Sequence, residues 1–176
     1  STAYYYQGKS KPVQECQRMV SMVAPTEMTV LICGASGTGK EYIAHSIHTS
    51  SDRADKPFIA VDCGAIPSEL AASEFFGHVK GAFTGAMENA NGMLLEANGG
   101  TLFLDEIGNL GHKVQMLLLR ALQEKKFRPV GGKKDISVDV RIIAATNEIL
   151  ESAVREERFR EDLFHRINEF TIHVPS

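Results

Sequence analysis

The 176-residue sequence is poor in cysteine, in long apolar stretches and in charge of one sign. Its three cysteines are an odd number without CxxC spacing, which speaks against a disulfide framework and against a zinc site. No uncharged apolar run approaches the ~18 residues of a membrane span, and the amino terminus shows no signal-peptide pattern. We therefore expect reduced core thiols in a cytoplasmic protein that does not bind a membrane.

The charge balance excludes another class of function. Acidic residues number 22 and basic residues 19, for a net charge of −3, and no lysine-rich block is interleaved with aromatic residues. Binding to a phosphate backbone needs a basic surface of that kind, so this chain is not expected to bind nucleic acid itself. Its length and its hydrophobic fraction of 43% are enough for one well-buried domain.

Short apolar strands alternate with helical patterns along the chain. A first helix, capped by Ser10, is predicted to run up to Pro25, because its apolar residues recur at helical spacing. Further helices are predicted over 41–48, 68–76, 114–122 and 159–167, strands over 29–33, 57–61, 101–104, 138–145 and 170–174, a hairpin at Gly131-Gly132, and a solvated, charged helix face over 151–160. The alternation predicts an α/β fold with a mostly parallel sheet and helices on both faces.

Residues 34–40 have the spacing G-x-x-x-x-G-K and lie between a predicted strand and a predicted helix. In such a loop, backbone N–H groups surround phosphates, the helix N-terminus favours the anion, and the lysine reaches the outer phosphates. Glycine punctuation alone is the alternative, and Glu41 replaces the usual Mg²⁺-binding hydroxyl. The strand, the helix and the lysine together favour a phosphate-binding loop formed by Gly34, Ala35, Ser36, Gly37, Thr38, Gly39, Lys40 and Glu41.

A second candidate element is the apolar strand 101–104, which is followed directly by Asp105 and Glu106. As a Walker B element, Asp105 holds Mg²⁺ and Glu106 activates the attacking water. An acidic pair after a buried strand is also a common helix cap or turn. A place on a separate strand of the sheet that carries the phosphate loop favours the catalytic interpretation.

A polar residue also follows the strand over 138–145. There the amide of Asn147 is suited to bond a γ-phosphate or to orient water at the carboxyl edge of the sheet. A plain strand-ending cap explains it equally well.

Arg160 and Arg166 lie six positions apart in one predicted helix. Guanidinium groups stabilise charge on a transferring phosphoryl group. Intrahelical pairing with a neighbouring acid, Glu161, Asp162 or Glu169, is the alternative.

A glycine-flanked hexapeptide lies between the phosphate loop and the acidic pair, and consists of Gly81, Ala82, Phe83, Thr84, Gly85 and Ala86. Its glycines allow sharp turns with positive φ, and its tip offers one large apolar side chain and one hydroxyl. A bare turn with a buried phenylalanine is the alternative to a contact loop.

Four segments, residues 34–41, 81–86, 99–106 and 159–166, in this order and spacing, closely resemble the central AAA+ domain of sigma-54-dependent bacterial transcription activators, the NtrC-like enhancer-binding proteins. The resemblance runs from about Gly8 to Pro175, and the GAFTGA hexapeptide is close to diagnostic. It also explains Glu41, because this family usually ends its phosphate loop in Gly-Lys-Glu.

The resemblance implies a fold. It is a P-loop NTPase (AAA+) three-layer α/β/α sandwich with a mostly parallel five-stranded sheet. Residues 1–7 are then an N-terminal tail or linker, and residues 8–176 the AAA+ α/β subdomain. The helical lid of the family, with its sensor II arginine, is expected beyond Ser176.

The resemblance also implies an activity. The family hydrolyses ATP to ADP and phosphate with Mg²⁺, here held by Asp105, and works as a hexameric or heptameric ring with sites between subunits. It remodels the closed complex of the sigma-54 RNA polymerase holoenzyme, in a two-component or other signal-responsive regulator that binds DNA through a separate domain. The hexapeptide, with Phe83 and Thr84 foremost, then contacts sigma-54, Asn147 matches sensor I, and Arg160 and Arg166 match the arginine fingers.

One position departs from the family pattern. Asp62 stands where the family commonly has an asparagine, which is thought to hold the Walker B glutamate by a hydrogen bond. An amide donates to Glu106, whereas an ionised carboxylate cannot, and two close carboxylates repel each other. Asp62 is therefore a candidate switch residue that shares a proton, binds through water or works differently.

Two other functions stay open. One is an interaction module that binds ATP without turnover, for which Asp62 is the support in the sequence. The other is a different P-loop machine, such as a helicase or chelatase subunit. His45 and His48 lie three apart on a predicted helix but lack the glutamate of HExxH, so they do not indicate a metal site. His78 either shapes the stem of the hexapeptide loop or lies on the surface.

Overall fold

The structure is a computed structural model that describes residues 11–175, so the expected cap Ser10 and the predicted tail 1–7 lie outside the described residues. In chain order, the elements are α2 (Lys11–Val23), β1 (Val30–Cys33), α3 (Lys40–Thr49), β2 (Phe58–Asp62), α4 (Ala71–Phe76), α5 (Met93–Glu96), β3 (Thr101–Asp105), the 3-10 helix η1 (Ile107–Asn109), α6 (His112–Glu124), β4 (Lys126–Phe127), β5 (Ile136–Ser137), β6 (Arg141–Thr146), α7 (Leu150–Arg155), α8 (Glu161–Ile167) and β7 (Phe170–His173).

The main sheet has five strands in the order β2-β3-β6-β1-β7, and each neighbouring pair is parallel. The carboxyl ends of all these strands therefore meet at one edge of the sheet, which we call the carboxyl edge; the opposite one is the amino edge. In register, Asp62 at the end of β2 lies beside Asp105 at the end of β3. The order of the strands thus brings two of the predicted site residues together.

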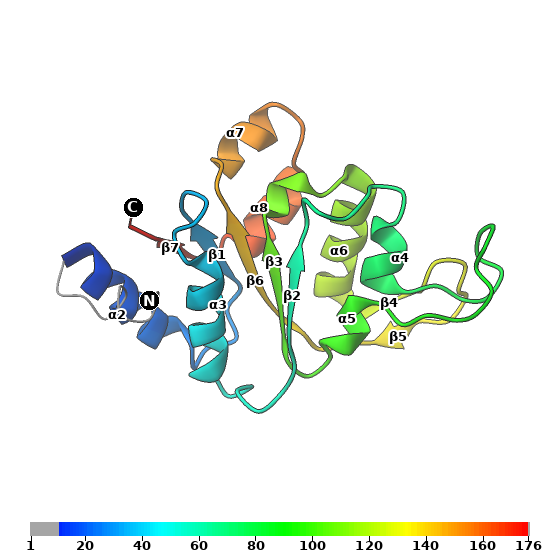
Figure 1. Ribbon diagram of the computed structural model, residues 1–176, viewed down its shortest axis with the longest axis horizontal. Coiled ribbons are helices and arrows are strands. Elements are labelled where there is room, and N and C mark those ends of the chain that lie inside the picture. Colours follow the sequence, from blue (N-terminus) through cyan, green and yellow to red (C-terminus); the bar gives the residue numbers. More distant parts are fainter. Residues whose placement is uncertain (1–10, 176) are drawn as a thin grey trace.

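Helices cover both faces of the sheet (Figure 1). Helices α2 and α3 pack on one face, through a cluster that includes Cys16, Ile43, Ile47, Phe103 and Ile172. Helices α4 to α8 pack on the other face, through a larger cluster that includes Phe75, Leu94, Leu102, Leu118 and Leu163. This three-layer arrangement confirms the predicted α/β/α sandwich, because residues that alternate along each strand supply both cores.

Some element boundaries differ from the predictions. The strand predicted over 138–145 begins only at Arg141, because the Val138 N–H bonds to the Lys125 carbonyl and the Asp139 N–H to the Asn98 side chain, outside the sheet. The helix predicted over 68–76 begins at Ala71. In the charged stretch 151–160, helix α7 ends at Arg155. Patterns of this length do not separate a short helix from a turn.

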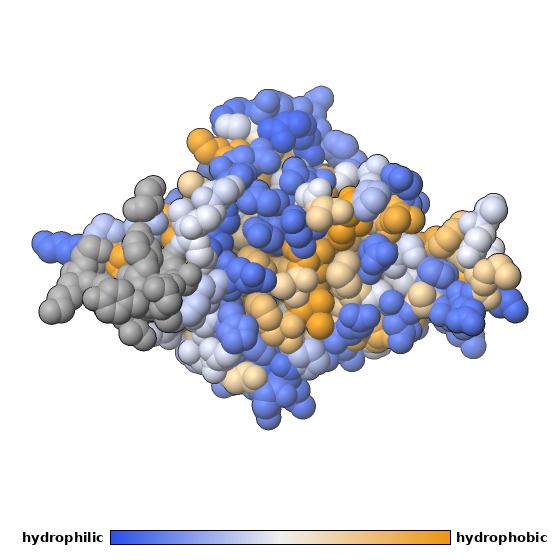
Figure 2. Space-filling model, viewed as in Figure 1, coloured by the Kyte–Doolittle hydropathy of each residue, from blue (hydrophilic) through white to orange (hydrophobic). Residues whose placement is uncertain are grey.

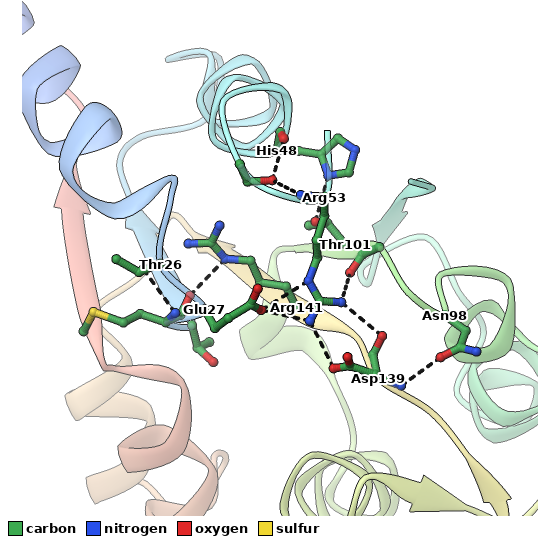
Figure 3. A network of polar contacts seen from close by, with 12 residues as sticks. Thr26, Glu27, His48, Arg53, Asn98, Thr101, Asp139 and Arg141 are labelled. Carbon is green, nitrogen blue, oxygen red and sulfur yellow. Dashed lines mark hydrogen bonds and ion pairs between the residues drawn. The ribbon is translucent and has the colours of Figure 1, made fainter. Parts of the chain in front are cut away.

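A polar network closes the amino edge of the sheet (Figure 3). Its centre is Arg141, whose side chain is 3% exposed and whose pKa is lowered by burial. The guanidinium donates to the carbonyls of Val23, Ala24 and Met28 at 2.8, 2.8 and 3.1 Å. Because a buried charge is tolerated only with full hydrogen bonding, these bonds fix the turn between α2 and β1 to β6.

Two more side chains complete this network. The Arg53 guanidinium donates to the Gly100 carbonyl at 3.0 Å and forms ion pairs with Glu27 at 2.8 Å and Asp139 at 3.0 Å. His48 is 3% exposed and lies 2.8 Å from the Thr101 hydroxyl and 3.0 Å from the Lys56 carbonyl. Burial lowers the pKa of His48, so the neutral ring donates to Lys56 and accepts from Thr101. The histidine is thus a structural residue of the core.

Candidate functional site

The phosphate-loop segment lies between β1 and α3, as the sequence predicted. Gly37 and Gly39 have φ of 81° and 86°, a left-handed region that strains other residues. Gly39 also precedes α3 as its N-cap and makes no side-chain capping bond, so the first N–H groups of the helix stay available to an anion. The loop therefore has the geometry that a phosphate group needs.

Lys40, the first residue of α3, is 6% exposed. Its ammonium donates to the Gly34 carbonyl at 2.7 Å, and lies 3.5 Å from the Glu106 carboxylate. The lysine thus spans the loop and reaches the acidic pair at the end of β3. The two motifs, more than 60 positions apart in sequence, form one site.

Glu106 follows β3 with φ 54° and ψ 54°, the left-handed conformation that non-glycine residues rarely adopt. This conformation turns its carboxylate toward the Lys40 ammonium at 3.5 Å and the backbone N–H of Asn147 at 3.3 Å. Residues held this way cluster at functional sites. The Asp105 carboxylate instead accepts the Glu106 N–H at 3.0 Å. The two adjacent acids thus have different surroundings, as separate roles require.

Asn147 directly follows β6 at the same edge and is exposed. Its amide donates to the Ser36 hydroxyl of the phosphate loop at 3.0 Å, while its N–H faces Glu106. The residue therefore links the loop to the acidic pair. One open cavity of about 360 Å³ joins these parts, and its lining comprises Ser36, Gly37, Gly39, Lys40, Glu41, Asp62, Asp105 and Glu106.

Asp62 contributes a further carboxylate to this cavity. Its side chain accepts the Gly64 N–H at 3.0 Å and so closes a local turn after β2, and no bond from it to Glu106 is present among the described residues. The negative charge of Asp62 also raises the pKa of two neighbouring groups. Burial, then Glu106, raises the pKa of Asp105, and Asp62 adds to the rise. Burial and the three carboxylates raise the pKa of the Cys63 thiol to about 12.

The donor set of the cavity suits a nucleoside triphosphate. The loop amides and Lys40 match phosphate oxygens, and Asp105 offers a hard oxygen ligand for Mg²⁺. Within residues 11–175, no three His, Cys, Asp or Glu side chains are grouped to hold a metal by themselves. Magnesium at a nucleotide site ordinarily takes most of its ligands from phosphates and water.

The GAFTGA hexapeptide lies in a loop that projects from the body together with the β4–β5 turn (Figure 1, right). Gly81 and Gly85 have φ of 84° and 95°, and the loop closes through a bond from the Gly81 N–H to the Ala86 carbonyl. Phe83 is 43% exposed, so the alternative of a buried phenylalanine is wrong. Figure 2 shows apolar residues reaching the end of this projection, where a soluble domain ordinarily places polar ones.

His78 shapes the stem of the loop, as one of the two interpretations predicted. Its backbone pairs with Ala90 across the stem, and its ring lies 2.7 Å from the Ser73 hydroxyl. The same ring meets the Phe83 ring edge to face at 4.9 Å between centroids. The Val79 N–H also bonds to the Val130 carbonyl, which ties the loop to the β4–β5 turn.

The two arginines do not share a helix, which corrects the prediction. Arg160 precedes α8 as its N-cap, and Arg166 lies in the last turn. Each one pairs with an acid of its own chain: Arg160 with Asp162 at 2.8 Å, and Arg166 with Glu169 at 3.1 Å. Neither lines the cavity that joins Lys40 to Glu106. Within one chain they are therefore not part of the site.

Sequence reasoning missed a buried glutamine that holds the segment before α8. Gln115 is fully buried, donates to the Leu110 and Arg158 carbonyls at 2.7 and 3.0 Å, and accepts the Arg160 N–H at 2.8 Å. A lone amide on the apolar face of a predicted helix was the signal available for it.

Glu148 was missed as well. Its carboxylate pairs with Arg158 at 3.1 Å and lies so close to Gly108 that a Cβ there would be 2.3 Å from it. Glycine at this position thus lets the segments after β3 and β6 touch.

The comparisons with known proteins agree with this geometry. Residues 6–173 match the family model of the sigma-54 interaction domain. The transcriptional regulatory protein ZraR of Escherichia coli strain K12 is 52% identical over 169 residues, which cover 96% of this chain and 38% of that protein. The crystal structure of NtrX from Brucella abortus in complex with ATP superposes with a TM-score of 0.88 at 40% identity, over 96% of this chain and 38% of that one.

A more distant structure gives the fold a name. The P-loop NTPase domain of a sigma-54 transport activator from E. coli superposes with a TM-score of 0.67 at 20% identity, over 96% of this chain and 98% of that chain. In the part of the chain that the structure describes, no helix has the length and apolar character to cross a membrane. The chain spans less than two fifths of ZraR and of NtrX. It belongs to the sigma-54 interaction domain family and has the fold of a P-loop NTPase.

Proposed function

We propose that this domain hydrolyses ATP with Mg²⁺ and uses the cycle to move the GAFTGA loop against sigma-54, so that the closed RNA polymerase complex at a promoter is remodelled. The assignment of residues 8–176 to one AAA+ α/β subdomain is part of this proposal, as is work within a signal-responsive regulator in the cytoplasm. Contact with DNA belongs to another domain of such a regulator.

The meeting of Lys40, Glu106 and Asn147 at the carboxyl edge carries the proposal. The ammonium is 3.5 Å from the Glu106 carboxylate, and the Asn147 N–H is 3.3 Å from it. A γ-phosphate that binds beside Lys40 thus comes next to a carboxylate that can take a proton from water and an amide that can orient it. Asp105, one position before Glu106, supplies the charge that Mg²⁺ needs.

Assembly into a hexameric or heptameric ring completes the proposed site. Arg160 and Arg166 lie outside the cavity of their own chain, so in this proposal they act on nucleotide held by a neighbouring subunit. Arginine supplied in trans is an established device for phosphoryl transfer, worth about 10³-fold or more in rate. Activity is then expected to rise with protein concentration.

A substitution at the loop tip tests the proposed output. In the full-length protein, Phe83→Ala should leave ATP turnover within about 2-fold of wild type, because the loop is remote from the cavity, and should abolish open-complex formation with the sigma-54 holoenzyme. Met87→Ala is the matched control: Met87 is 77% exposed beside the hexapeptide, and its loss should leave both readouts intact. Unchanged promoter opening by Phe83→Ala would instead favour a different P-loop machine.

A second substitution separates turnover from binding alone. Asp62→Asn keeps an oxygen that can accept the Gly64 N–H, so the turn after β2 should survive. We expect ATP turnover to change by less than about 10-fold, since one nearby charge is worth about 1 kcal/mol in a hydrated site. A rise from negligible to ordinary turnover would show that the natural protein is a nucleotide-gated interaction module.

A further inference from the structure

The two candidate finger arginines use their guanidinium groups differently. Arg160 engages Asp162 through Nε and Nη2, at 3.0 and 2.8 Å, so one full edge of its fork is occupied. Arg166 is held by Nη1 alone, at 3.1 Å from the Thr29 hydroxyl and 3.1 Å from the Glu169 carboxylate. Among residues 11–175, no acceptor is bonded to Nε or Nη2 of Arg166.

Glu169 is anchored in turn. The same oxygen that accepts from Arg166 also accepts the Thr29 N–H at 3.1 Å. Thr29 is 4% exposed and directly precedes β1, the strand whose other end opens into the phosphate loop. Neither partner of Arg166 is therefore free to swing, and the Nη1 end of the guanidinium is fixed to the core of the sheet.

Space lies beside the fixed guanidinium. Arg166 and Thr29 line a cavity of about 370 Å³ at the amino edge of the sheet, together with Arg53 and Arg141. The acids that line it, Glu27 and Asp139, are both paired with Arg53. An edge with two N–H donors in a fixed plane binds a phosphate in a bidentate manner.

We infer that Glu169 and Thr29 are positioning residues for Arg166: they hold it by Nη1 and keep its Nε–Nη2 edge for a phosphate of ATP bound by a second copy of this chain. The inference rests on the proposed function. It also distinguishes the roles of the two arginines, because the Nε–Nη2 edge of Arg160 is already bonded to Asp162. A carboxylate acts here as the orienting partner of an arginine, so its loss misplaces the cation without removing it.

Steady-state ATPase kinetics of the full-length protein test this inference. Glu169→Gln should lower kcat about 10-fold and leave the KM for ATP unchanged, because the nucleotide is held by another subunit's loop. Thr29→Val should lower kcat less, about 3-fold. Glu161→Gln is the matched control on α8: this acid is 75% exposed, forms an ion pair only with His165 among the described residues, at 3.5 Å, and should have no effect.

Mixed assemblies distinguish a misplaced finger from a damaged fold. Lys40→Ala subunits cannot hold ATP but carry an intact Arg166. Added to Glu169→Gln subunits, they should raise turnover above the sum of the two separate preparations, because intact fingers now face loaded sites. Absence of that rise, with both proteins folded by circular dichroism, would overturn the inference.

Arg166→Ala separates this inference from the proposed function on which it rests. Wild-type turnover by Arg166→Ala would refute the finger role and with it the proposed shared site. Loss of turnover by Arg166→Ala together with wild-type kcat for Glu169→Gln and Thr29→Val would refute only the positioning role. If Asp162→Asn lowered kcat more than Glu169→Gln does, the guanidinium that contacts the phosphate would be that of Arg160. This result would also refute the positioning role of Glu169 and Thr29.

Discussion

At the amino edge of the sheet, Arg141 bonds three carbonyls at 2.8 to 3.1 Å, and Arg53 bonds two acids and two carbonyls. At the carboxyl edge, Glu106 sits in a left-handed conformation, and its contacts to Lys40 and Asn147 are 3.5 and 3.3 Å long. Charged side chains therefore gather at both edges of the same sheet. The guanidinium groups of Arg141 and Arg53 have short bonds to nearly every donor, while Glu106 keeps long contacts beside a surplus of carboxylates.

This difference indicates which charged side chains stabilise the fold and which are available to bind a ligand. A saturated buried cation stabilises the native state because its loss leaves acceptors unpaired. A strained residue with long contacts gains little from its neighbours, and its conformation costs stability that only function explains. Substitutions at Arg141 and Arg53 should therefore lower stability and spare turnover, and those at Glu106 should do the reverse.

The largest expected effect is at Glu106. Glu106→Gln should lower kcat for ATP by about 10²- to 10⁴-fold, because the amide cannot accept a proton from water, while ATP still binds. Glu106→Gly should be equally inactive yet more stable by about 1 kcal/mol, since glycine adopts the observed φ of 54° without strain. ATPase assays and urea unfolding measure the two effects.

Glu151→Gln serves as the control for this pair. Glu151 is an exposed acid of α7 near the carboxyl edge, where burial, and then the charge of Glu151, raise the pKa of the Cys33 thiol. Its loss should change neither turnover nor stability. A destabilised Glu106→Gly protein would show that Glu106 holds the fold, and the contrast between the two edges would disappear.

The next largest effect is expected at Arg141, and on stability. Arg141→Met keeps the length of the side chain but leaves the Ala24 and Met28 carbonyls without this donor, while the Val23 carbonyl keeps its bonds from Thr26; we expect a cost of about 3 kcal/mol in the free energy of unfolding. Turnover per folded molecule should stay near wild type. Arg155→Met, at an exposed position of α7, should leave the urea midpoint unchanged. Equal midpoints for the two variants would refute the structural role of the amino edge.

Much of the site could be predicted because its parts are local. The G-x-x-x-x-G-K spacing places a loop between a strand and a helix, and an acidic pair after an apolar strand lies at the carboxyl edge of any parallel sheet. Two such segments on parallel strands must approach each other. The meeting of Lys40 and Glu106 follows from these facts alone, and the structure shows it.

The saturated edge could not be predicted in the same way. Arg141 opens an apolar strand, and its acceptors lie 113 to 118 positions away, in a turn that no local pattern joins to it. Gln115 likewise bonds Arg158 across 43 positions. Partners of this kind depend on the packing of whole elements. The predicted start of α8 at residue 159 was wrong for a related reason, since Arg160 keeps the extended conformation of an N-cap while its N–H bonds to the distant Gln115 side chain.

The smallest expected effect concerns His48 and pH. Because burial lowers its folded-state pKa below the ordinary 6.5, the unfolded chain takes up a proton at a higher pH than the folded one does. Stability from this group is therefore full above about pH 7 and falls as the pH drops through 6.5, by at most about 1.4 kcal/mol per pH unit. His48→Gln keeps a donor for the Lys56 carbonyl and an acceptor for the Thr101 hydroxyl without a titrating group.

Urea unfolding at pH 7.5 and 5.5 measures this effect. The loss of stability at the lower pH should be smaller in His48→Gln than in wild type, whereas His45→Gln, on the exposed side of α3, should match wild type. If all three proteins lose the same stability between pH 7.5 and 5.5, protonation of His48 does not determine the acid sensitivity of the fold. The sensitivity would then come from the carboxylates at the carboxyl edge.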